Sequence, residues 1–175
     1  FKYFQLILSI WISTFVFISI DLLVQYFCGY NFFLQSNTFP GRLSGVMGNE
    51  LKIGGYYLGF YFFSIAAVTK IFSKRIYIVS ILIVFFTLIS FLIGERANFL
   101  KVFSGLLIFL FFWDKYKVKY KLLILSLIFA LLIIGGNLNQ NLKYRFVGQF
   151  SSYIIDNGFK AYYYNSQYGA HYGTS

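Results

Sequence analysis

Long runs of apolar residues, separated by short polar segments, dominate the sequence. Five runs, at about 3–20, 53–69, 76–93, 97–113 and 120–136, are long enough for helices that cross a hydrocarbon core of about 30 Å. None of them alternates apolar and polar residues with period two, as the strands of a membrane barrel do. The pattern therefore predicts an all-α integral membrane protein with about five transmembrane helices.

Composition supports this class and excludes two others. The chain has 175 residues, of which 59% are hydrophobic, 24% aromatic and 11% charged. A soluble domain has about 25% charged residues, so this chain lacks the polar surface to be one, and its apolar content excludes disorder. Because it opens on Phe1 and ends in a polar stretch, we expect a fragment of a larger polytopic bundle, with residues 1–136 inside the bundle and 137–175 beginning a large loop.

Charge indicates an orientation rather than a nucleic-acid partner. The formal net charge is +10, and basic residues gather in two connections between predicted spans: Lys70, Lys74 and Arg75, then Lys115, Lys117, Lys119 and Lys121. Basic loops mark the cytoplasmic side of a membrane. The segments 29–52, 94–96 and 137–175 are then expected on the outer face. Cys28 is the only cysteine, so no intrachain disulfide can form.

Two outer segments carry charged residues suited to an anionic ligand. The stretch 41–55 is rich in glycine, and its Arg42 supplies a planar fork that suits phosphate oxygens. The alternative is a flexible loop whose arginine meets lipid headgroups. Glu95 and Arg96 form a tight turn between two spans, and Lys101 lies about 7 Å deeper in the second span. Lys101 either extends outward to the interface or lines a polar cavity.

The tail adds Lys143, Arg145, the only histidine, His171, and many tyrosines. Tyrosines of this kind form an interfacial belt or, alternatively, a platform on which sugar rings stack. An exposed histidine with a pKa near 6.5 can accept a proton at neutral pH.

Together these cations predict a pocket for a lipid-linked pyrophosphate at the membrane edge. Arg42, Arg96, Lys101 and Arg145 come from separate segments that share one face. The sequence has no Asp-x-Asp pair or His/carboxylate cluster for a divalent metal, so we expect no metal or other cofactor. Preorganised arginines would then stabilise a departing pyrophosphate.

The order of these segments resembles that of a family of bacterial envelope enzymes. The matching pieces are Arg42-Leu43-Ser44-Gly45-Val46-Met47-Gly48-Asn49-Glu50 before a span, Gly94-Glu95-Arg96-Ala97-Asn98-Phe99-Leu100 between spans, Arg145-Phe146 after the last span, and Gly169-Ala170-His171-Tyr172-Gly173-Thr174-Ser175. They resemble the O-antigen polymerase and O-antigen ligase superfamily, with the last piece similar to the His-containing stretch of its large periplasmic loop.

The resemblance implies a metal-independent, inverting glycosyltransferase of the bacterial inner membrane that acts on undecaprenyl-pyrophosphate-linked oligosaccharide at the periplasmic face. It implies that Arg42, Arg96 and Arg145 bind pyrophosphate or sugar, and that His171 activates or orients the acceptor hydroxyl. We assign Arg42, Arg96 and His171 to catalysis. Assigned to substrate binding are Arg145, Lys101, Glu50, Lys52 and Glu95. Membrane lipid and envelope polysaccharide assembly proteins are the other expected partners.

Several alternatives stay open. Ligases of this family usually have Asn or a similar polar residue after the histidine, whereas Tyr172 follows here, so a polymerase is favoured over transfer of the glycan to lipid A-core. A transporter or flippase would place its site near the bilayer midplane on broken helices, whereas the only proline, Pro40, is in a loop. A structural subunit that binds only anionic lipid is the third alternative.

Overall fold

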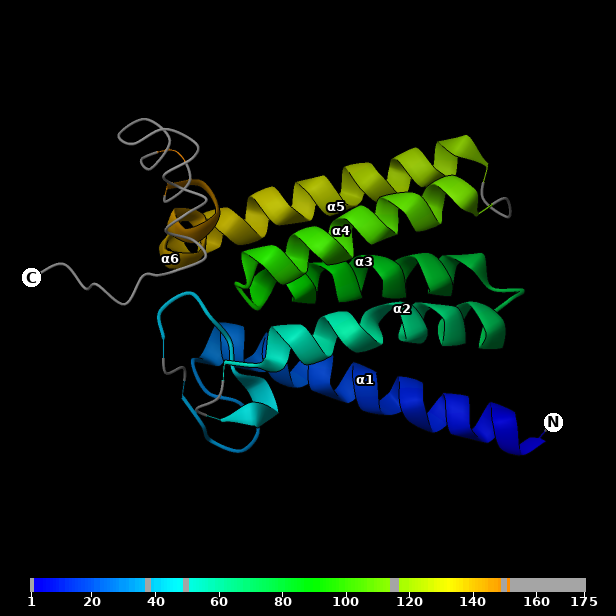
Figure 1. Cartoon of the computed structure of the whole chain (residues 1–175), viewed down its shortest axis with the longest axis horizontal. Helices are drawn as coiled ribbons and strands as arrows, with labels where there is room; N and C mark the ends of the chain where they lie inside the picture. The colour runs from blue at the N-terminus through cyan, green and yellow to red at the C-terminus, as the bar shows by residue number, and fades with distance from the viewer. Residues whose placement is uncertain (1, 37–38, 49–50, 114–116, 149–150, 152–175) are drawn as a thin grey trace, which may run out of the picture.

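The protein is a bundle of five long helices, shown as a computed structural model in Figure 1. The structure describes residues 2–36, 39–48, 51–113, 117–148 and 151. The long helices are α1 (Lys2–Cys28), α2 (Ile53–Ile71), α3 (Ile76–Leu92), α4 (Arg96–Phe112) and α5 (Val118–Leu138). Three short elements complete it: the 3₁₀ turn η1 (Gly45–Met47), the helix α6 (Gln140–Lys143) and the π-helical turn η2 (Tyr144–Gly148). No strand occurs in the described part of the chain, so the prediction of an all-helical fold is confirmed.

Helix α3 is the centre of the bundle. It packs against α1, α2, α4 and α5, and its side chains Ile83, Phe86 and Ile89 are completely buried. Such dense apolar packing is what an almost uniformly hydrophobic helix requires when other helices surround it. The other long helices bury one face against α3 or its neighbours and leave the opposite face open.

The open faces are apolar. Large hydrophobic side chains are exposed on every long helix, among them Ile10, Phe63, Ile81, Ile108 and Ile133. Two helices, at Tyr3–Cys28 and Val118–Leu138, are long and apolar enough to cross a membrane, and α3 is apolar but shorter. On this criterion the count of five spans stays a prediction.

The first helix continues eight residues beyond the run of 3–20 that the sequence predicts. It passes through the polar residues Asp21 and Gln25, which follow the predicted run. Both side chains are completely buried. They remain inside the helix because the following loop folds back over them and supplies hydrogen-bond partners.

The loops divide between the two ends of the bundle (Figure 1). The long α1–α2 loop, the α3–α4 turn, α6 and η2 lie at the left-hand end of the view. The amino terminus and the α2–α3 and α4–α5 connections lie at the opposite end. The described parts of the three segments that the sequence assigns to one face of the membrane therefore lie at the same end of the bundle.

A buried hydrogen bond joins α2 to α3. The Tyr61 hydroxyl lies 2.6 Å from Thr87 Oγ1, which itself donates to the carbonyl of Ile83, and both side chains are fully buried. We predict that Tyr61→Phe lowers the free energy of unfolding by about 1 kcal/mol, because an interhelical hydrogen bond is lost. Unfolding by SDS in mixed micelles measures it. Tyr77→Phe is the matched control, since Tyr77 is 73% exposed; equal losses for both variants would contradict the assignment.

Candidate functional site

At the left-hand end of the bundle, two chain segments meet with almost no side chain between them. Gly41 of the α1–α2 loop and Gly94 of the α3–α4 turn both have left-handed backbones, with φ of +72° and +79°. A Cβ on Gly94 would overlap the carbonyl oxygen of Gly41. The backbone amide of Leu43 donates to the carbonyl of Ile93 at 3.1 Å. These contacts fix the loop on the turn. They place Arg42, which lies between Gly41 and Leu43 in the sequence, against the start of α4.

Arg42 forms an ion pair with Glu95, the residue before α4. Arg42 Nη2 lies 2.7 Å from Glu95 Oε1, and the side chains are only 25% and 11% exposed. Asn98 donates to the second carboxylate oxygen of Glu95, and Gly54 of α2 leaves room for that carboxylate, which a Cβ there would overlap. Arg42 Nη2 also lies 3.4 Å from the carbonyl of Leu51, whereas its Nε is buried without a partner among the described residues.

A second arginine, Arg145, comes from a segment 51 residues after the α3–α4 turn. Arg145, in η2, donates from Nε to the carbonyl of Gly94 at 3.3 Å, and its Cδ would lie 2.9 Å from a Cβ on Gly41. Burial lowers the pKa of its guanidinium, and the positive charges of Arg42 and Arg96 lower it further. The carboxylate of Glu95 acts in the opposite direction. Two guanidinium groups and one carboxylate therefore act on Arg145 at this end of the bundle.

Aromatic packing holds η2 in place beside the turn. The centroid of the Phe146 ring lies 4.6 Å from the ring centroid of Phe91 in α3 and 5.7 Å from that of Phe99 in α4. Phe91 and Phe99 also pack edge to face against each other. Phe146 thus packs between α3 and α4, which restricts the positions that the neighbouring Arg145 side chain can take.

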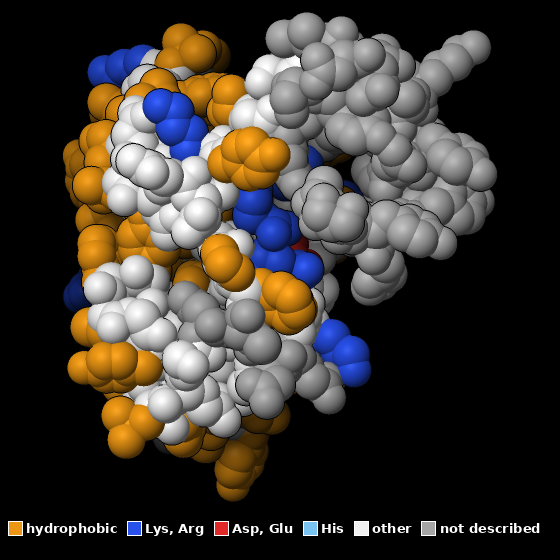
Figure 2. Space-filling view, turned by 90° about the vertical axis from the view of Figure 1, so that its left-hand side faces the viewer, with side chains coloured by type: hydrophobic (Ala, Val, Ile, Leu, Met, Phe, Trp, Pro, Cys, Tyr) orange, Lys and Arg blue, Asp and Glu red, His pale blue; other side chains and the backbone are white. Residues whose placement is uncertain are grey.

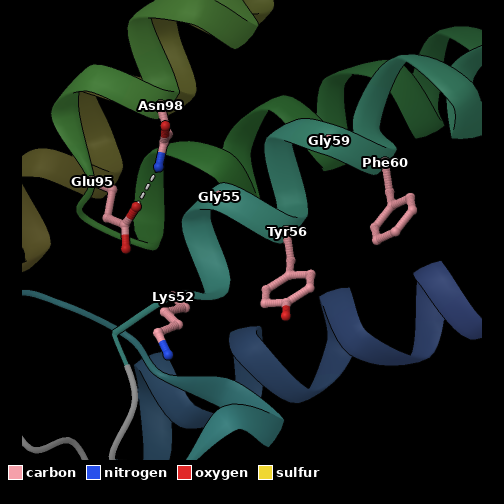
Figure 3. Close-up of a pocket in the computed structure, with 7 residues that line it drawn as sticks. All are labelled: Lys52, Gly55, Tyr56, Gly59, Phe60, Glu95 and Asn98. Atoms are coloured by element: carbon pink, nitrogen blue, oxygen red, sulfur yellow. Dashed lines mark hydrogen bonds between the residues drawn. The ribbon is translucent and has the colours of Figure 1, made fainter.

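Figure 2 shows this end of the bundle from outside. Lys and Arg side chains gather near its middle, with an acidic side chain beside them and apolar side chains around them. Seven residues line an open pocket of about 490 Å³ next to the ion pair: Lys52, Gly55, Tyr56, Gly59, Phe60, Glu95 and Asn98. Figure 3 shows Lys52, Glu95 and Asn98 around the first turn of α2. The rings of Tyr56 and Phe60 lie further along the same helix. The pocket is polar at one end and apolar along the helix.

A smaller pocket of about 310 Å³ lies between α3, α5 and η2. Its walls include Phe91, Phe129 and Phe146, and Asn137 and Lys143 are its polar lining residues. Across the described residues, no group of three His, Cys, Asp or Glu side chains is close enough to hold a metal ion.

The structure brings together most of the residues that the sequence singles out. Arg42, Glu95 and Arg145 are in contact or joined through Gly94, and Arg96 acts on Arg145 through its charge. Lys52 and Glu95 line the larger pocket. Lys101 is not brought in: its side chain is exposed on α4 and lines neither of the two pockets. Glu50 and His171 lie outside the described residues, as does most of the tyrosine-rich tail.

Sequence reasoning missed Asn98 and the glycines that allow the close approach. Asn98 lies three residues after Glu95, so both are on one face of the first turn of α4, and this spacing is a readable signal. Gly54 of α2 faces the Glu95 carboxylate, and nothing in the sequence around Gly54 indicates this role.

Comparison of the chain with models of known protein families, with curated proteins and with solved structures found no match.

We predict that Gly94→Ala frees the loop from the turn. The added Cβ overlaps the Gly41 carbonyl, so the hydrogen bond from Leu43 to Ile93 weakens, and hydrogen exchange at the Leu43 amide becomes about 10-fold faster or more. Exchange mass spectrometry of the peptide that contains Leu43 measures it. Gly29→Ala is the control, because Gly29 has φ +82° and nothing within 4 Å. It carries the same backbone strain without the overlap, so equal acceleration in both variants would refute the contact.

Proposed function

We propose that this protein is a glycosyltransferase of the bacterial inner membrane that polymerises or transfers undecaprenyl-pyrophosphate-linked oligosaccharide at the periplasmic face. The observation that carries the proposal is the convergence of Arg42, Arg96 and Arg145 around Glu95 at one end of an apolar bundle. The motif resemblance in the sequence supplies the substrate class.

Five membrane crossings are part of this proposal. The long helices have 27, 19, 17, 17 and 21 residues, which at about 1.5 Å per residue match or approach the thickness of a hydrocarbon core. Their outward faces carry exposed Phe, Ile and Leu side chains, which lipid stabilises and water does not. The tight α3–α4 turn and the short α2–α3 connection are consistent with consecutive antiparallel spans.

The cluster fits the leaving group of glycosyl transfer. An acceptor hydroxyl attacks the anomeric carbon while the bond to the lipid pyrophosphate breaks on the opposite face, which inverts the configuration. The departing pyrophosphate gains negative charge, and guanidinium groups already in place stabilise it without reorganisation. His171, outside the described residues, is the group that we assign to the acceptor hydroxyl.

The ion pair orders the arginine cluster. The carboxylate of Glu95 neutralises the charge of Arg42. Asn98 donates to the same carboxylate and holds it at the start of α4. A pyrophosphate, with more charge than one carboxylate, competes for the same guanidinium. The larger pocket beside the pair, cationic at Lys52 and apolar along α2, suits a ligand whose phosphate is joined to an isoprenoid chain.

We predict that Arg42→Ala and Arg145→Ala each lower the rate of oligosaccharide transfer by about 10²- to 10³-fold, the usual cost of removing one preorganised donor. Membranes that contain the protein and lipid-linked repeats are assayed for chain length and yield. Lys74→Ala, an exposed lysine at the opposite end, is the control and retains wild-type activity. Unchanged chain length and yield in both arginine variants would end the assignment. Loss of transfer to lipid A-core alone would identify a ligase.

The orientation has its own test. In a chain with Cys28→Ser, we predict that Lys143→Cys reacts with a membrane-impermeant maleimide in intact spheroplasts, whereas Lys74→Cys reacts only after permeabilisation. Both positions are exposed and lie at opposite ends of the bundle. The reverse pattern would put the arginine cluster in the cytoplasm and exclude a periplasmic transferase.

A further inference from the structure

The loop after α1 does not leave the bundle but turns back along the helix. The backbone amide of Phe32 donates to Asp21 Oδ1 at 2.8 Å, and the Phe32 ring stacks on that of Phe17 with centroids 5.7 Å apart. Asp21 and Phe17 precede the end of α1 at Cys28 by two and three helical turns, which is about 10 and 16 Å. The turn at 31–35 therefore lies beside the helix.

This part of α1 is level with the interior of the bundle. Ser19 of α1 shares a hydrogen bond of 2.9 Å with Tyr57, which lies one turn inside α2, whose first residue is Ile53. Phe17 lies half a turn deeper still. In Figure 1 the loop lies alongside the ends of α1 and α2.

The turn satisfies its own backbone amides. The amides of Phe33 and Gln35 donate to the side-chain oxygen of Asn31, and that of Leu34 donates to its carbonyl. The amide of Asn31 donates to the carbonyl of Gln35, and that of Phe32 to Asp21. All five amides from Asn31 to Gln35 thus have acceptors inside the protein, so no backbone donor of the turn would be left unpaired in a hydrocarbon environment.

The side chains of the turn point the other way. Phe32, Phe33 and Leu34 are consecutive and are 50%, 60% and 80% exposed. Leu34 has φ +61°, a left-handed conformation that costs a side-chain-bearing residue about 1 kcal/mol and that glycine or asparagine usually adopts in water. The strained residue is thus a large apolar one, and it is the most exposed of the three.

Charge is absent from the whole segment. The residues from Leu22 to Gly41 include no Asp, Glu, Lys or Arg. The exposed apolar tip is continuous, through the stacked Phe17 ring, with the exposed face of α1 that also includes Ile20 and Phe27. A loop in water would need polar side chains at such positions, whereas lipid is the environment that this continuous surface fits.

We propose that the turn Asn31–Gln35 is a short re-entrant element that inserts into the adjacent lipid leaflet, with Phe32, Phe33 and Leu34 in contact with acyl chains. The proposal rests on the membrane placement given above, but neither on the sidedness nor on glycosyl transfer. It has a consequence for the site: Gln25, which donates to the carbonyl of Gln35, also accepts from the amides of Ser44 and Gly45. The lipid-inserted turn and the segment that carries Arg42 are held by one buried side chain.

The test measures the surroundings of residue 34 directly. In a chain with Cys28→Ser, Leu34→Cys is labelled with bimane and the protein is reconstituted into phosphatidylcholine vesicles. We expect lipids brominated on the acyl chain to quench the label at least half as strongly as they quench it at Ile133→Cys, an exposed apolar position on α5. We expect aqueous iodide to quench it at least fivefold less than at Lys143→Cys, an exposed position at the same end of the bundle.

Two results would overturn the proposal. Quenching by iodide as strong as at Lys143→Cys would put the turn in water. Protection from both quenchers would show that another protein surface, such as a second copy of the chain, covers it. Because neither readout involves transfer, this proposal and the glycosyltransferase proposal can fail separately.

Discussion

The close approach of two backbones, between Gly41 and Gly94, is the contact on which the proposed site depends. Neither position has a Cβ, and both have left-handed φ angles, so the α1–α2 loop lies directly on the α3–α4 turn. With any side chain at Gly94 the two segments would separate. Arg42 would then lose its ion pair with Glu95.

The charges gathered by this contact are not balanced. The charges of Arg42 and Arg96 act on Arg145, and one carboxylate, Glu95, partly offsets them. Burial lowers the pKa of Arg145 and the two neighbouring positive charges lower it further, so they raise the free energy of its charged form. An anion that enters relieves this repulsion. A site assembled in advance in this way suits binding of a phosphorylated group whose charge increases as it leaves.

Buried polar side chains near the end of α1 and in the loop after it perform a second task. Asp21, Gln25 and Asn31 are at most 1% exposed, and together they hold two stretches of the loop against the helix. One stretch is the apolar turn, and the other leads from Arg42 into η1. The hydrogen bonds of these side chains favour one loop conformation, because an alternative would leave more of these buried groups without partners; Asp21 Oδ2 already has none among the described residues. Asp21 and Gln25, which interrupt the apolar run of α1, thereby organise the loop.

The sequence by itself determined the helices, because runs of 17 or more apolar residues permit no other regular structure when polar backbone must be satisfied within the segment. It also identified Arg42, Glu95 and Arg145 as candidates. The tertiary structure alone decided that α1 continues through Asp21, that Lys101 lines neither pocket, and which residues meet. Arg145 contacts Gly94, 51 residues earlier in the chain, and such contacts follow from helix packing and from glycines whose need is set by a neighbour distant in sequence.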